Sequence, residues 1–302
     1  MTSAHRTLTG HAREISACAF SPDGTFLVSA SVDTTLKVWD VRSGAARATL
    51  AGHRHAVWGC SVSPRGDRIV SASLDHTLAI WDARTGSREH VVHGHTSPTS
   101  CAVSPDGSWF VSGSYDDFPL RLWSVGSGAG RGALPGHRDA VMACAISPDG
   151  AWIASASKDR TLRIWDVAAH SAPRALSGHE HWVRDCAISP DGAWLVSASR
   201  DRTLRIWESA SGELRRVLAG HTDSVWGCAI SPSGAWVVSA GTDRTVRLWR
   251  AATGAERARI ELPGELTCVA AHPSLALAAA GDRHGTVHLV DLGDVEWARG
   301  PG

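Results

Sequence analysis

The sequence has little lysine, no net charge and no long apolar run. Of the 30 basic residues only Lys37 and Lys158 are lysine, and 30 acidic residues balance them. A general polyanion binder needs a basic excess, so this balance argues against that class but leaves room for a local basic patch. The apolar stretch from Leu275 to Ala280 is far too short to cross a bilayer. No secretory signal is visible at the start, and we expect a cytoplasmic protein that makes no membrane contact.

Motifs that would announce catalysis or a metal site are also missing. The sequence contains no Walker motif, no glycine-rich phosphate loop, no kinase signature and no Cys-x-x-Cys pair. Its seven cysteines are evenly spread, which fits neither a disulfide framework nor a zinc site, and we expect small buried apolar side chains. We therefore expect no enzyme activity, no metal and no cofactor in this chain.

The dominant feature is an internal repeat. Gly-His pairs begin at positions 10, 52, 94, 136, 178 and 220, which are 42 residues apart. Tryptophan recurs at the same spacing, and it is followed by aspartate in three of the units. Cysteine appears once in each of seven units, at Cys18, Cys60, Cys101, Cys144, Cys186, Cys228 and Cys268. A fixed period of this length predicts a solenoid or a propeller.

Each unit contains four short strand-like segments. In the fourth unit, an apolar run from Val141 to Ile146 ends at a Ser-Pro-Asp-Gly turn, and residues 152–156 and 161–165 follow with a tight turn between them. Residues 174–176 make a fourth segment, and no stretch has a sustained helical period. The pattern predicts an all-β protein.

These motifs resemble the WD-repeat (WD40) family. The resemblance implies a seven-bladed β-propeller with four antiparallel strands in each blade. We expect one propeller over residues 1–292, with blades near 10–50, 52–92, 94–134, 136–176, 178–218, 220–260 and 264–291. Residues 5–9 should supply the missing outer strand of the last blade, and residues 293–302 should form a loose tail.

The resemblance also assigns a structural role to the repeated polar residues. In the family, histidine, serine, aspartate and tryptophan form a hydrogen-bonded tetrad within the blade. The matching sets are His11, Ser29, Asp33 and Trp39; His53, Ser71, Asp75 and Trp81; His95, Ser112, Asp117 and Trp123; His137, Ser155, Asp159 and Trp165; His179, Ser197, Asp201 and Trp207; and His221, Ser239, Asp243 and Trp249. A Ser, His and Asp together suggest a hydrolase, but sixfold recurrence with tryptophan as fourth member favours the structural interpretation.

The seventh unit breaks this pattern. Ala280 replaces the serine, His284 stands at the place of the aspartate, and Val290 replaces the tryptophan. Gly264 and Leu266 hold the positions that line the pore in other units. We expect a degenerate blade held by ring closure.

Positions that differ between otherwise similar units are free for recognition. In the family, one face is lined by the start of the inner strand and by the residue before the turn aspartate. Transferred to this sequence, the candidates for partner binding are Trp58, Leu74, Met142, Lys158, Trp182, Arg184, Arg200 and Trp226. Tryptophan and arginine are enriched at binding hot spots. Arg160, Arg202 and Arg244 in the adjoining turns add to an aromatic and basic sector.

We therefore expect a non-catalytic scaffold or sensor, a monomeric propeller that binds a protein or peptide of acidic or phosphate-bearing character. Such arrays resemble interaction modules of larger signalling proteins, so the chain is expected to be part of one. Two alternatives stay open: a propeller enzyme with its site at the pore mouth, and a nucleic-acid binder that uses the same sector. A structural alternative for the sector is that its tryptophans pack across the pore while its arginines pair with neighbouring aspartates.

Overall fold

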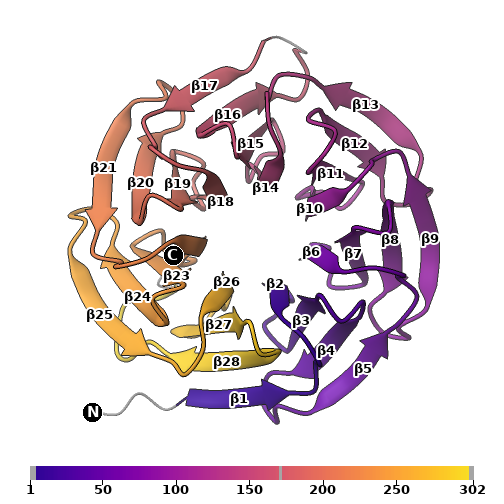
Figure 1. The fold of residues 1–302 in the computed structure, drawn as a ribbon, viewed down its shortest axis with the longest axis horizontal. Coiled ribbons are helices and arrows are strands. Elements are labelled where there is room, and N and C mark those ends of the chain that lie inside the picture. Colours follow the sequence, from indigo (N-terminus) through magenta and orange to yellow (C-terminus); the bar gives the residue numbers. More distant parts are fainter. Residues whose placement is uncertain (1–4, 170–171, 299–302) are drawn as a thin grey trace.

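The apolar runs and turns of each repeat fold into short strands, in a computed structural model that describes residues 5–169 and 172–298. The strands form seven separate four-stranded antiparallel sheets, arranged as blades around a central channel (Figure 1). The predicted all-β, seven-bladed propeller is confirmed. No helix in the described part of the chain could span a membrane.

The innermost strands surround the channel, and the second strands lie directly outside them. The innermost strands are β2 (Ile15–Phe20), β6 (Val57–Val62), β10 (Pro98–Val103), β14 (Val141–Ile146), β18 (Val183–Ile188), β22 (Val225–Ile230) and β26 (Leu266–Ala271). The second strands are β3 (Phe26–Ser31), β7 (Arg68–Ser73), β11 (Trp109–Ser114), β15 (Trp152–Ser157), β19 (Trp194–Ser199), β23 (Trp236–Gly241) and β27 (Leu277–Asp282).

The third and fourth strands complete each blade toward the rim. The third strands are β4 (Leu36–Asp40), β8 (Thr77–Asp82), β12 (Leu120–Ser124), β16 (Thr161–Asp166), β20 (Thr203–Glu208), β24 (Thr245–Arg250) and β28 (Thr286–Asp291). The outermost strands are β5 (Ala46–Leu50), β9 (Arg88–His93), β13 (Gly130–Leu134), β17 (Arg174–Ser177), β21 (Leu214–Ala219), β25 (Glu256–Glu261) and β1 (His5–Thr9).

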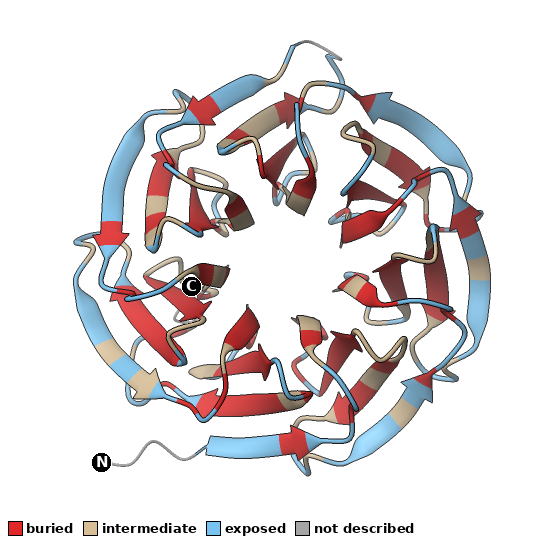
Figure 2. Ribbon diagram, in the orientation of Figure 1, coloured by how far each residue is buried: buried red, intermediate tan, exposed pale blue. Residues whose placement is uncertain are grey.

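Burial follows these layers (Figure 2). The second strands are almost entirely buried, whereas the outermost strands expose most of their residues. The core lies between blades: one cluster joins Trp194 and Val196 of blade five to Val225 and Val237 of blade six. Each blade is therefore stabilised by its neighbours on both sides.

Ring closure occurs as predicted. β1 pairs antiparallel with β28, in a register that runs from His5 opposite Val290 to Thr9 opposite Thr286. Blade seven thus combines strands from both ends of the sequence, and no outer edge of that blade is left without its fourth strand.

The expectation of a loose tail is wrong for residues 293–298. After β28 the chain returns toward blade six, and Trp297 is only 3% exposed within the apolar cluster that contains Trp236. The repeat pattern predicts no contact for this tryptophan, because its partners are distant along the chain. Residues 299–302, also assigned to the tail, lie outside the described residues.

Candidate functional site: the pore mouth of the top face

Every innermost strand carries one β-bulge, and the extra residue is placed at the channel. The register of each first strand pair skips one residue, and the skipped residues are Ser16, Trp58, Thr99, Met142, Arg184, Trp226 and Thr267. Bulges leave a residue outside the ladder and are common beside functional sites. The fold therefore presents seven positions whose side chains are not needed to pair strands. They lie toward the top face, which is formed by the Gly-His loops and by the turns between second and third strands.

Three bulge positions have a structural role. The hydroxyl groups of Ser16, Thr99 and Thr267 donate hydrogen bonds to a backbone carbonyl in the next blade. The acceptors are Val57, Val141 and Ile15, each the residue before the bulge of the following blade. A small hydroxyl residue at the bulge thus ties neighbouring blades together.

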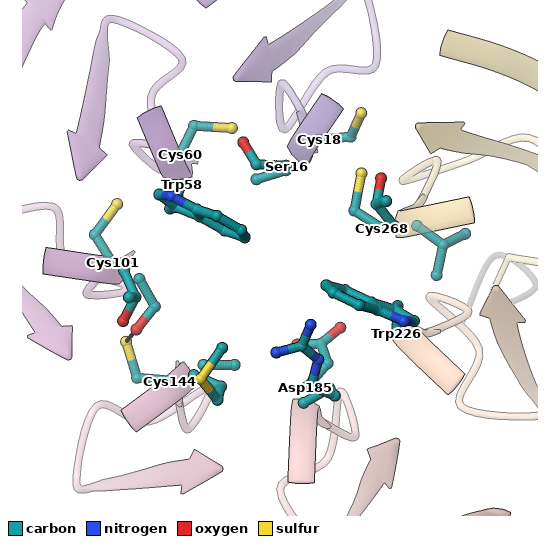
Figure 3. Close-up of a pocket in the computed structure, with 18 of the residues that line it drawn as sticks. Ser16, Cys18, Trp58, Cys60, Cys101, Cys144, Asp185, Trp226 and Cys268 are labelled. Atoms are coloured by element: carbon teal, nitrogen blue, oxygen red, sulfur yellow. Dashed lines mark hydrogen bonds between the residues drawn. The ribbon is translucent and has the colours of Figure 1, made fainter. Parts of the chain in front are cut away.

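The other four bulge residues are large, and none of their side chains makes that bond in the described chain. Trp58, Met142, Arg184 and Trp226 instead line a central cavity of about 250 Å³. Trp58 and Trp226 project into the channel from opposite sides (Figure 3). The Nε1 atom of Trp58 is buried without a hydrogen-bond partner among the described residues, so this side chain is not held by a polar contact. The large residues give up an inter-blade hydrogen bond that serine or threonine would form.

Around this mouth, cations lie over aromatic rings. The Lys158 ammonium is 3.8 Å from the ring centre of Tyr115 and 4.1 Å from that of Trp182. The Arg200 guanidinium lies 5.0 Å from the same Trp182 ring. The Arg184 guanidinium lies 3.4 Å from the ring centre of Trp226. We call Tyr115, Lys158, Trp182, Arg184, Arg200 and Trp226 the aromatic–cationic sector.

The cations of this sector form no ion pair. Within residues 5–169 and 172–298, no carboxylate lies at ion-pair distance from Lys158, Arg184 or Arg200. Burial, followed by repulsion from Arg200, lowers the pKa of Arg184 to about 10, and the Glu14 carboxylate opposes the shift. The turn arginines, which the structural alternative pairs with neighbouring aspartates, form no such pair in this part of the chain either. The sector therefore has positive charge that an incoming anion would neutralise.

Acidic groups also stand around the mouth. Burial raises the pKa of Glu14 above its ordinary value, although Arg283 and Arg184 oppose the shift. Asp116, next to Tyr115, accepts a hydrogen bond from Ser97, and Glu265 pairs with Arg283 at 3.0 Å. Acidic and basic groups are therefore interspersed around the mouth.

Not every residue predicted for this face belongs to the sector. Leu74 is partly buried, and its backbone N–H donates to Ala56 O at 2.9 Å, but it does not line the cavity. Tyr115 was missed as a site residue, although the extra residue that unit three carries around it was a usable signal. The seventh unit also needs correction: Leu266 is fully buried, and Thr267 takes the bulge position.

The six tetrads form as the resemblance implied. In blade one, His11 Nδ1 lies 2.8 Å from Asp33 Oδ2, and His11 Nε2 lies 2.8 Å from Ser29 Oγ. Trp39 Nε1 donates to the same Ser29 Oγ at 2.8 Å. The other five blades repeat this chain of contacts.

The tetrad serines are not placed for nucleophilic attack. Ser29 is 0% exposed, and its oxygen already accepts from the indole N–H of Trp39. Burial lowers the pKa of His11, so the ring is held neutral between Asp33 and Ser29. The tetrad is a satisfied buried network with no room for a substrate.

The cysteines are free thiols around the channel, and six of the seven line the cavity. Burial raises the pKa of Cys144 to about 12, which makes its thiol unreactive. The seventh cysteine is one residue out of register: Val269 takes the repeated position, and Cys268 lies beside Cys18 of blade one. In the described part of the chain, no group of three His, Cys, Asp or Glu residues is placed to hold a metal ion.

Asp185 is a buried charge that sequence reasoning missed. Its two oxygens accept from the backbone N–H of Cys186 at 2.8 Å and of Cys228 at 2.9 Å, so it joins blades five and six. Burial raises its pKa to about 6. The available signal was a carboxylate at a strand position that is glycine or alanine in four other units.

The family model described as "WD domain, G-beta repeat" matches six segments of the chain: residues 3–40, 44–82, 86–118, 131–166, 171–208 and 212–250. The matched segments end before blade seven, the blade without a tetrad.

Among curated proteins, the chain is similar to Periodic tryptophan protein 2 of Saccharomyces cerevisiae, with 51% identity over 134 residues, which is 44% of this chain and 14% of that protein. It is 51% identical over 37 residues to Ribosome assembly protein 4 of the same yeast, which is 12% of this chain and 7% of that protein. It is 47% identical over 38 residues to Protein Mut11 of Chlamydomonas reinhardtii, 13% of this chain and 10% of that protein. The chain thus spans only a small part of the length of these relatives.

Proposed function

The chain belongs to the WD40 family, and from this premise we propose that it is a non-catalytic protein-interaction scaffold whose partner docks on the aromatic–cationic sector at the pore mouth. The partner is a protein or peptide segment that carries carboxylates or phosphates. One of the relatives is named a ribosome assembly protein, and this name fits the proposed class of function.

This proposal rests on one observation: the cations of the sector contact aromatic rings and form no ion pair with a carboxylate in the described chain. Lys158, Arg184 and Arg200 lie on aromatic faces and pair with no carboxylate in the described chain. A partly desolvated cation without a counter-ion gains more from an incoming anion than a surface cation that is already paired. Tryptophan and arginine together supply the contact types that dominate binding energy at interfaces.

One structural cost supports selection for binding at this place. The four large bulge residues forgo the inter-blade hydrogen bond that Ser16, Thr99 and Thr267 make. The top-face turns add charge without such a cost. Blades four to six have arginine at a turn position whose left-handed φ is shared by Thr34 and His76 of blades one and two, so the conformation belongs to the repeat and only the side chain differs.

The acidic groups of the mouth limit where the bound segment can lie. An acidic stretch would lie over Lys158, Arg184 and Arg200, and Glu14 and Asp116 would repel it from their own places at the mouth.

The test compares two double variants on the intact chain. Arg184→Thr/Trp226→Thr places at the bulges the residue that Thr99 and Thr267 show to be compatible with the fold. We expect this variant to be at least as thermally stable as wild type. It should no longer capture partners, and its affinity for a labelled Glu-rich or phosphoserine peptide should fall at least tenfold. Leu214→Ala/Val217→Ala on the exposed rim is the control and should bind as wild type.

Unchanged binding by the Arg184/Trp226 variant would place the interface elsewhere. Oligonucleotide binding with a steep salt dependence, stronger than peptide binding, would favour a nucleic-acid partner instead.

A further inference from the structure

The segment after β28, residues 292–298, is anchored at both ends and exposed between them; we call it the return segment. Leu292 and Trp297 are 5% and 3% exposed, whereas Gly293, Asp294 and Glu296 face solvent. Gly293 has a φ of +81°, a left-handed conformation that turns the chain back toward blade six. Two buried anchors joined by an exposed stretch form a docked strap.

The return segment is held by its backbone carbonyls. Trp236 Nε1 donates to Glu296 O at 3.0 Å, and Ser233 Oγ donates to the same oxygen at 3.2 Å. The backbone N–H of Ser233 donates to Trp297 O at 3.1 Å. Three donors of blade six thus converge on two consecutive carbonyls, which is how a built peptide site recognises an extended chain.

Blade six has a serine, Ser233, at the turn position that contacts the return segment. Units one, three, four and five have aspartate at the equivalent turn position, where Asp23, Asp106 and Asp149 accept hydrogen bonds from their own turns. A carboxylate at position 233 would face the Glu296 carbonyl oxygen and could not donate to it, while the backbone N–H would still donate to Trp297 O. Unit two also departs from Ser-Pro-Asp-Gly, with Arg65, and blade six is where a departure to a small hydroxyl side chain meets the return segment.

Trp297 also contacts blade seven, next to the place where the ring closes onto blade one. Trp297 Nε1 donates to His272 O at 2.8 Å, in the bottom turn of blade seven. The His272 ring contacts Gly24 O of blade one at 3.2 Å and lies edge-on to Phe20 at 5.0 Å. One tryptophan therefore connects blade six to blade seven, and through His272 to blade one.

We propose that the surface formed by Ser233, Trp236 and His272 is a peptide-docking site filled by the return segment, and that this docking replaces the missing tetrad as the tie that holds blade seven in the ring. Blade seven has Ala280 and Val290 where the other blades have their serine and tryptophan. Val290 is smaller than the tryptophan that it replaces, and the indole of Trp297 enters the same apolar cluster from outside the blade.

Ser233→Asp in the full chain tests the docking. It restores the residue of four other units, so the turn itself is expected to fold. Hydrogen exchange should show protection falling about tenfold or more for residues 293–298 and for β27 and β28, with β22 to β24 unchanged. Asp149→Ser, the reverse exchange at a turn without a docked segment, is the matched control and should change neither region.

Trp297→Ala leaves the turn intact and provides the second arm. It should reproduce the loss of protection in β27 and β28. Protection of residues 293–298 that survives Ser233→Asp would overturn the assignment of the docking site. Loss there without loss in β27 and β28, or loosening of blade seven in Ser233→Asp but not in Trp297→Ala, would overturn the tie.

Discussion

Blade six and blade seven are neighbours with nearly the same strand layout but different internal chemistry. Blade six holds its tetrad, with His221 2.8 Å from Asp243 and Trp249 donating to Ser239 at 2.8 Å. Blade seven has neither of these contacts among its described residues. Asp282 instead accepts from the backbone N–H of His284 and Thr286 and lies 3.0 Å from His288 Nε2.

The difference shows two ways to stabilise the same sheet. A tetrad blade is held from within, by a buried chain of polar groups that joins the Gly-His loop, the second strand, the turn after it and the third strand. Blade seven is held at its rim by β1, at its top turn by Asp282 and at its bottom turn by Trp297. The stability of a tetrad blade should therefore depend on the protonation and packing of its interior. The stability of blade seven should depend on β1 and on the return segment, which reach it from other parts of the chain.

The largest expected effect is acid destabilisation of the tetrad blades. Burial lowers the pKa of His11, His53, His95 and His137 below the ordinary value, so the unfolded chain takes up protons first as the pH falls. This stability is present above about pH 6.5 and is lost below it. Because four rings act together, the melting temperature should fall more between about pH 7.5 and 5 than with any single substitution below. A flat profile would contradict a neutral tetrad.

Trp249→Val gives blade six the residue that blade seven has at this place. Trp249 is 1% exposed, and its loss leaves a cavity and removes one of the two tetrad hydrogen bonds of Ser239, so we expect a cost of about 3–5 kcal/mol in urea unfolding. Trp152→Val, at a partly exposed strand position outside the tetrad, is the control and should cost less. Equal costs would mean that the tetrad adds nothing beyond apolar packing.

Asp282→Ala removes the polar anchor of blade seven. Three hydrogen-bond contacts lose their acceptor, and two of the donors are backbone groups in the turn, so we expect about 1–3 kcal/mol of destabilisation. Exposed Asp291→Ala at the end of β28 is the comparison. Indistinguishable unfolding curves for the two variants would show that Asp282 does not anchor the blade.

Asp185→Ser compares the pH dependence of stability at two blade junctions. The junction of blades five and six contains the buried carboxylate of Asp185, whereas the junction of blades six and seven has Gly227 at the equivalent position. The raised pKa of Asp185, about 6, means that its charge costs stability above about pH 6 and nothing below about pH 4. Relative to the variant, wild type should lose about 3 kcal/mol across that window. A pH-independent difference between the two proteins would contradict the shift.

The smallest effect is expected for Arg202→Gly, which gives blade five the turn residue of blade seven, where Gly285 has a φ of +86°. Removing left-handed strain from Arg202 should stabilise the protein by roughly 0.5–1 kcal/mol, measured by thermal unfolding. The same variant should bind acidic peptide less well. A loss of stability would show that the arginine side chain supports the fold.

The fold and the tetrads could be predicted because repetition multiplies every signal. A single His, Ser or Asp says little, but the same offsets in six units identify the role of each, and Arg6-Thr7-Leu8 could be recognised as an outer strand by comparison with later units. Recurrence also singled out Trp58, Arg184 and Trp226 as departures from the pattern.

Residues that occur only once escaped this reasoning. Asp282 and Trp297 act through neighbours that no repeat predicts, and the position of Cys268 depends on a one-residue shift that places Thr267 at the bulge. Asp185 was hidden in an apolar strand because its two partners are backbone groups of adjacent blades. Such contacts follow from three-dimensional neighbourhood, which a period along the chain does not contain.

The pairing of His5 with Val290 has a consequence for biosynthesis. A ribosome adds about 5–20 residues per second, so the first strand waits on the order of tens of seconds before its mate emerges. Until then the incomplete ring ends in two blades that each lack a neighbour on one side. These blades are similar, so each could pack against the wrong blade. Late assembly of the last blade makes translation speed and chaperone protection part of how this molecule reaches its native state.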